Sequence, residues 1–137
     1  MSYYFATTLD TTMEDAITRV TEALKERGFG VLTEIDVKAT LKKKIGADFR
    51  PYVILGSCNP QFAYRALQAE SRIGVMLPCN VIVQELEPGR VEVAAVDPIA
   101  SMAAIENPEL EPIAREVQSR LKDVIESLEA DAPASAA

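Results

Sequence analysis

The only two cysteines of the chain lie in two similar short motifs, Ser57-Cys58-Asn59-Pro60 and Pro78-Cys79-Asn80-Val81. The first motif is expected where a strand over residues 52–57 gives way to a helix, and the second where a strand over residues 80–86 begins. If these strands are antiparallel neighbours, the end of one lies beside the start of the other. The sequence therefore predicts that the two Cys-Asn pairs meet in space, and this is its best lead to a functional site.

Two interpretations of the cysteines stay open. In the first, Cys58 is a thiolate stabilised by the N-terminus of the helix that begins at Pro60, because unpaired N–H groups and the macrodipole lower a thiol pKa. Cys58 and Cys79 would then carry redox equivalents, sulfane sulfur or a soft metal such as Cu(I), whose two-coordinate site needs no histidine. In the second, each cysteine is a small buried apolar residue at a strand end.

Four polar residues near the motifs are further candidates. Asn59 has the position of a helix N-cap, and Asn80 is expected to bind backbone across the same junction. Asp97 could act as a general acid or base, although aspartate before proline is typical of a turn. Arg65 lies on the helix that follows Asn59 and could reach an anion or remain on the surface. With the cysteines, these residues form the predicted ligand site: Cys58, Asn59, Arg65, Cys79, Asn80 and Asp97.

The residue types that the chain lacks exclude several kinds of chemistry. The sequence contains no histidine, which removes the commonest general base and the commonest metal ligand. Two cysteines alone cannot complete a tetrahedral zinc site within one chain. Gly28 and Gly30 precede a strand and do not join a strand to a helix, so no nucleotide-binding loop is indicated. We expect no catalytic residues and no cofactor.

Charge and composition restrict the partners. The formal net charge of −7 argues against binding to nucleic acid or to an anionic membrane. Lysines cluster around residues 38–44, which is typical of a solvated helix face. The first residues lack the features of a signal peptide, and no apolar stretch approaches membrane-spanning length, so a cytoplasmic location with free thiols is expected.

Hydrophobic periodicity predicts a single α+β domain over residues 1–130 and a disordered tail over residues 131–137. The expected sheet is antiparallel, has about five strands and is covered by helices on one face. Thr11 and Glu14 have capping-box spacing, and Gly28 ends the helix that they begin. Further expected elements are a first strand over residues 2–8, a strand over residues 31–37, a short helix over residues 38–45 with Leu41 and Ile45 inward, a hairpin turn at residues 87–89, and a long helix over residues 108–130.

The segments 52–60 and 74–83, together with Val96-Asp97-Pro98, resemble the domain of unknown function 302 family. The segment 36–42 and Met102 extend the resemblance through most of the chain. It implies strand, helix, four strands and helix, a fold similar to that of the TATA-binding protein, and assembly into dimers. Many members carry a histidine near Tyr64, and this sequence departs from that pattern.

These observations lead to two functional hypotheses. In the leading one, the protein is a non-enzymatic cytoplasmic homodimer that binds a small ligand or a partner in a cleft at the two Cys-Asn motifs. In the alternative, Cys58 and Cys79 make it a thiol-dependent redox, sulfur-carrier or Cu(I)-binding protein.

Overall fold

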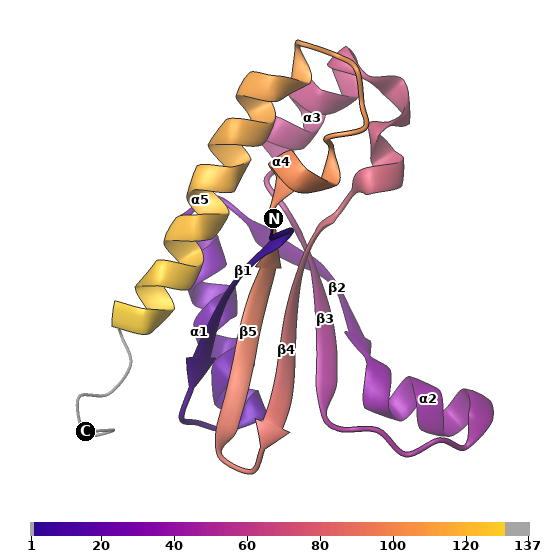
Figure 1. Cartoon of the computed structure of the whole chain (residues 1–137), viewed down its shortest axis with the longest axis vertical. Helices are drawn as coiled ribbons and strands as arrows, with labels where there is room; N and C mark the ends of the chain where they lie inside the picture. Colours follow the sequence, from indigo (N-terminus) through magenta and orange to yellow (C-terminus); the bar gives the residue numbers. More distant parts are fainter. Residues whose placement is uncertain (1, 131–137) are drawn as a thin grey trace.

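The computed structural model describes residues 2–130 and contains one antiparallel sheet of five strands in the order β1-β5-β4-β3-β2 (Figure 1). The tail predicted for residues 131–137 lies outside the described residues. The strands are β1 (Tyr4–Leu9), β2 (Gly30–Asp36), β3 (Tyr52–Cys58), β4 (Cys79–Glu87) and β5 (Arg90–Val96). The helices are α1 (Met13–Glu26), α2 (Val37–Ile45), α3 (Pro60–Ala69), the 3-10 helix η1 (Ser71–Met76), α4 (Pro98–Ser101) and α5 (Leu110–Ala130).

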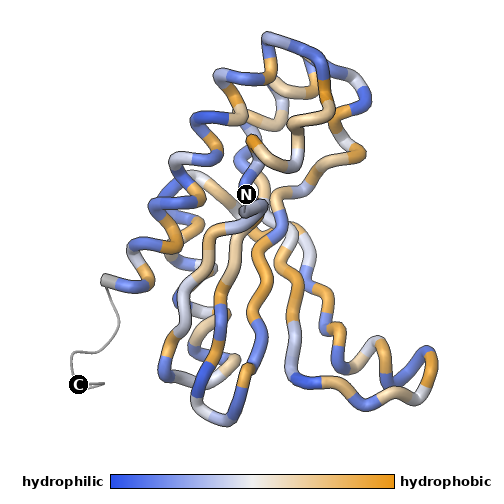
Figure 2. The backbone as a smooth tube through the Cα atoms, in the orientation of Figure 1, coloured by the Kyte–Doolittle hydropathy of each residue, from blue (hydrophilic) through white to orange (hydrophobic). Residues whose placement is uncertain are grey.

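Helices α1 and α5 cover one face of the sheet, which confirms the predicted α+β class. The side chains between these layers form the main core, because the inward positions of β3, β4 and β5 are almost all branched and apolar. A smaller cluster around Ile73 packs α3 and η1 against the start of α5. Hydrophobic segments run along the central strands, and hydrophilic ones gather at the β4–β5 hairpin end (Figure 2).

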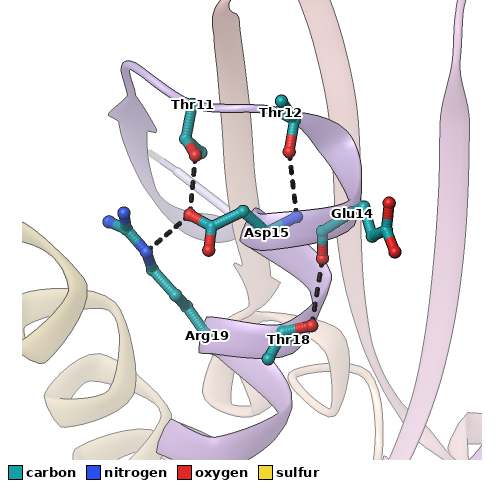
Figure 3. Close-up of polar contacts among 6 residues, drawn as sticks. All are labelled: Thr11, Thr12, Glu14, Asp15, Thr18 and Arg19. Carbon is teal, nitrogen blue, oxygen red and sulfur yellow. Dashed lines mark hydrogen bonds and ion pairs between the residues drawn. The ribbon is translucent and has the colours of Figure 1, made fainter.

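The start of α1 differs from the predicted capping box by one residue. Thr12, not Thr11, is the N-cap, and its side chain accepts a hydrogen bond of 3.1 Å from the backbone N–H of Asp15. Thr11 instead donates its hydroxyl to the Asp15 carboxylate at 2.6 Å, and Arg19 binds the same carboxylate at 2.8 Å (Figure 3). The acidic residue that supports the cap is therefore Asp15, and Glu14 contributes only its backbone carbonyl, to Thr18.

Strand β2 contains an irregularity that the sequence pattern did not reveal. Val31 pairs with Ser57 and packs against the core, but the register shifts before Thr33, so that Thr33 and Ile35 face the other side. Val31 therefore does not share a face with Thr33 and Ile35, as strict alternation along a regular strand would require. A bulge of this kind moves every later side chain to the opposite face.

Helix α2 projects beyond β2 away from the rest of the domain (Figure 1). Asp36 caps its start and Gly46, at a φ of 68°, ends it, as a left-handed C-cap requires. No residue of α2 is buried, and Ile45 is 73% exposed. The prediction that Ile45 points inward is wrong, because the helix has no layer of the domain to pack against.

The remaining boundaries agree with the sequence to within about two residues. Asn59 caps α3, with Pro60 at the first helical position, and Gly89 has the positive φ of 82° expected in the β4–β5 turn. Asn107 accepts a hydrogen bond from the N–H of Glu109, but regular helix begins only at Leu110. Among the described helices, none combines the length and the apolar character needed to span a membrane.

Candidate functional site

The pairing of β3 with β4 brings the two Cys-Asn motifs together, as predicted. Ser57 lies opposite Cys79, and Gly56 lies opposite Asn80. Gly56 marks a close approach of the chain, because a Cβ atom there would lie 2.8 Å from Pro78 Cγ and would also collide with the Thr33 hydroxyl. No residue other than glycine allows Pro78 to pack this closely beside the first motif.

The motifs meet at the wall of a narrow cavity of about 30 Å³. It lies between the end of the sheet, α3, and the segment from α4 to the first half of α5. The lining is mainly apolar and includes the thiols of Cys58 and Cys79 and the thioether residue Met102. The other lining residues are Phe29, Ser57, Asn59, Phe62, Ala63, Ala66, Leu77, Pro78, Pro98, Leu110, Ile113, Ala114 and Val117.

The oxygen-bearing side chains of the lining already have partners. The Ser57 side chain is fully buried, and its hydroxyl donates a hydrogen bond of 2.7 Å to the Cys79 carbonyl. Asn59, which is 9% exposed, accepts from the N–H of Phe62 at 3.3 Å and so caps α3. These bonds fix both motifs and engage the side-chain oxygen atoms of the lining, so the sulfur atoms are its remaining side-chain electron-pair donors.

The surroundings of the thiols favour their protonated forms. Burial raises the pKa of Cys79 to about 11, and the nearby Cys58 adds to this increase. Burial also raises the pKa of Cys58, which is only half-buried. This direction is opposite to the lowering expected from the start of α3, and its cause is the cost of desolvating a thiolate in this apolar site.

A second layer of contacts holds Asn59 and Phe62 in place. At Gly28, with a φ of 86°, a Cβ atom would lie 2.9 Å from Asn59 Nδ2, so the α1–β2 turn packs directly on the cap. The Arg120 guanidinium lies 4.9 Å from the centre of the Phe62 ring and donates to the Arg27 carbonyl at 3.1 Å. Arg120 thereby ties α5 to both neighbouring segments.

Three predicted site residues lie outside the cavity lining. Asn80 is exposed on the opposite face of the sheet, in a depression shared with Tyr4 and Tyr52. Asp97 caps α4, and its carboxylate accepts from the Ile99 N–H at 2.9 Å and from Gln118 Nε2 at 3.0 Å. Arg65 is exposed on α3 with its guanidinium 5.6 Å from the centre of the Phe62 ring.

Met102 and Arg120 belong to the site although sequence reasoning did not place them there. Met102, which entered the sequence analysis only through the family resemblance, lines both the cavity and an open groove of about 740 Å³ between α4 and α5. Met102 lies shortly after Asp97-Pro98, and this position in the sequence could have indicated that it belongs to the site. Arg120 carried no such signal, because its partners lie on segments far away in the sequence.

The comparisons with known proteins agree on one family. The family described as "Domain of unknown function DUF302" matches residues 5–128. The crystal structure of an uncharacterized conserved DUF302 protein from Bacillus stearothermophilus superposes with a TM-score of 0.84 at 34% identity, over 92% of this chain and 98% of that one. No curated protein sequence matches. The chain therefore belongs to the DUF302 family.

Proposed function

We propose that the protein is a non-enzymatic, homodimeric binding domain that takes a small ligand in the cavity at the two Cys-Asn motifs. The observation that carries this proposal is the convergence of both motifs, from separate strands, on one apolar cavity whose walls are held by the hydrogen bonds of Ser57 and Asn59. Ligand sites are commonly concave and apolar, with a few fixed polar groups.

The size of the cavity limits the ligand. A volume of about 30 Å³ has room for a water molecule or a single ion, since one water needs at least about 10–15 Å³ measured in this way. A metabolite would require α3 and α4 to separate. The ligand that fits the site without rearrangement is therefore an ion or a molecule of two or three atoms.

The non-enzymatic assignment rests on the chemistry of the same lining. The cavity lining contains no carboxylate, and the hydroxyl of Ser57 and the amide oxygen of Asn59 are engaged by backbone groups. The Asp97 carboxylate accepts hydrogen bonds from the N–H of Ile99, at the start of α4, and from the side chain of Gln118. General acid or base catalysis needs a titratable group within reach of the reacting atoms, and the lining offers only the two thiols, whose protonated forms are favoured by burial.

The homodimer is supported by the face of the sheet opposite α1 and α5, which no other described helix covers. An apolar row crosses all five strands of this face through directly paired residues: Ala6, Ala94, Ile82, Ile54 and Ile35. Sheets that face water normally carry polar side chains at such positions. If the same row of a second chain packs against this one, both rows are removed from water, and the two chains contact each other through identical surfaces.

Charge is compatible with this contact. Two chains of net charge −7 repel each other unless cations lie near the interface. Helix α2 supplies them at the β2 edge of the apolar row, through Lys38, Lys42, Lys43 and Lys44. Glu92 lies on the same face toward the hairpin end of β5, so a second copy finds a charge opposite to that of the lysines along this surface.

A thermal-shift screen against metal ions, inorganic anions and small metabolites tests the proposed site. Ala63→Leu fills the cavity, whereas Gln68→Leu adds the same side chain at an exposed position of the same helix. We expect one ligand class to raise the Tm of the wild type and of Gln68→Leu but not of Ala63→Leu. If no class raises the Tm of the wild type, or if Ala63→Leu responds equally, the cavity is not the ligand site.

A further inference from the structure

We propose that the ligand of this cavity is a single soft monovalent metal ion, Cu(I), bound by the sulfur atoms of Cys58, Cys79 and Met102. This inference rests on the proposed function and specifies its ligand. Two observations support it: the sulfur atoms that line the cavity, and the groove that connects the cavity to solvent.

The donors that remain free in the cavity are all sulfur. The three residues Cys58, Cys79 and Met102 line the same space, while the oxygen atoms of Ser57 and Asn59 are engaged in the bonds described above. Thiolate and thioether ligands select Cu(I), whereas oxygen ligands suit Mg²⁺ and Ca²⁺. Nowhere in residues 2–130 do three His, Cys, Asp or Glu side chains gather to hold a metal ion. Met102 completes a set of three donors that the two cysteines alone do not provide.

The apolar lining favours a complex without net charge. A buried unpaired charge is costly, so a monovalent ion is best matched by one thiolate and neutral donors. Cys58 is half-buried and Cys79 is buried, so the Cys58 thiol is the one with access to solvent for release of its proton. On binding, the Cys58 S–H bond breaks, the proton leaves to solvent, and the sulfur donates an electron pair to Cu(I). The oxidation state of the metal does not change.

A route from solvent ends at Met102. This residue, together with Leu110 and Ala114, lines both the cavity and the larger open groove between α4 and α5. The groove also contains Glu106 and Glu111, whose charges attract a cation, although Arg115 pairs with Glu111 at 2.7 Å. A thioether at the boundary can receive the ion from the groove before the thiols take it up.

Competition between the protein and the Cu(I) chelator bathocuproine disulfonate, under anaerobic reducing conditions, tests the proposal. We expect one Cu(I) per chain. Cys58→Ser and Cys79→Ala should abolish binding, and Met102→Leu should weaken it by at least the roughly tenfold loss typical of a missing supporting partner. Met76→Leu changes a methionine outside the cavity and should leave the affinity unchanged.

The variants are to be compared only after circular dichroism confirms that each is folded. Leucine has nearly the same volume as methionine, so Met102→Leu is the variant expected to keep the fold and to allow a comparison of affinity with the wild type. Wild type that does not compete with the chelator would overturn the metal proposal. Binding that is equal in wild type and Met102→Leu would overturn the three-sulfur site. If another ligand still stabilises the wild type but not Ala63→Leu, the proposed binding function stands and only its ligand is wrong.

Discussion

At the scale of single residues, the two thiols of the cavity differ in how they are held. Cys79 is buried at the start of β4, where its carbonyl accepts the Ser57 hydroxyl. Cys58 is half-buried at the end of β3. The same apolar lining suppresses ionisation of both, so neither thiol is a ready nucleophile at neutral pH without a metal or another electrophile to replace its proton.

Substitution of Cys79 measures its packing role. Cys79→Ser should lower the free energy of unfolding by about 1–3 kcal/mol, because a hydroxyl is buried in a lining that offers it no free partner. Cys79→Ala introduces no polar atom and should cost less. Urea unfolding followed by circular dichroism gives both values. A serine variant as stable as the alanine variant would show that the side chain at position 79 reaches water.

The raised pKa of Cys79 predicts a loss of stability at alkaline pH. Between the ordinary thiol value near 9 and the folded value of about 11, the unfolded chain loses its proton while the folded chain keeps it. The unfolded state then binds fewer protons, so the free energy of unfolding falls as pH rises through this window, by at most about 2–3 kcal/mol. The difference between wild type and Cys79→Ala from pH 8 to 11 isolates this contribution from other titrating groups. A difference that does not change with pH would contradict the burial of the thiol.

At the scale of elements, the site depends on the close packing of Pro78, which precedes β4, against Gly56 in β3. Gly56→Ala should destabilise the protein by about 1–3 kcal/mol, because the added methyl group overlaps Pro78 and Thr33. Gly30→Ala is the matched control in a neighbouring strand, since a Cβ atom there meets no other atom within 4 Å. Chemical denaturation compares the two. Equal losses would show that Gly56 contributes only backbone freedom.

Local patterns in the sequence were sufficient to predict most elements and the meeting of the Cys-Asn motifs. The cap at Asn59 and the hairpin at Gly89 depend on neighbouring residues, so sequence alone identifies them. Asp97 was expected to form a turn, and it caps the short helix α4 instead. The bulge in β2 and the exposure of Ile45 depend on which element lies alongside, which the local pattern does not encode.

In the site, too, some residues could be placed from local sequence patterns and others could not. Cys58, Asn59 and Cys79 could be placed because they flank strands that pair. Met102 reaches the site from the turn that follows α4, and Arg120 from the middle of α5. Their roles follow from packing between distant segments. Asn80 was grouped with the cavity although its side chain alternates to the opposite face of the sheet, one position after Cys79.

At the scale of the whole molecule, the uncovered face of the sheet predicts the oligomeric state. Ile82→Lys places a charge in the centre of the apolar row and should convert a dimer to a monomer while the fold is retained, because its side chain is not part of the core between the layers. Ser119→Lys adds the same charge at an exposed position on α5 and should leave the dimer intact. Light scattering coupled to size-exclusion chromatography measures both. A wild type that is already monomeric would contradict the proposed interface.

Native mass spectrometry tests the central claim most directly, because one spectrum reports both assembly and occupancy of the cavity. After incubation with the ligand class selected by the thermal-shift screen, the wild type should appear as a dimer carrying one ligand per chain. The Ala63→Leu variant, whose added side chain fills the cavity, should appear as a dimer without ligand. A wild type that remains a bare monomer, or an Ala63→Leu variant that carries the ligand as the wild type does, would contradict the account.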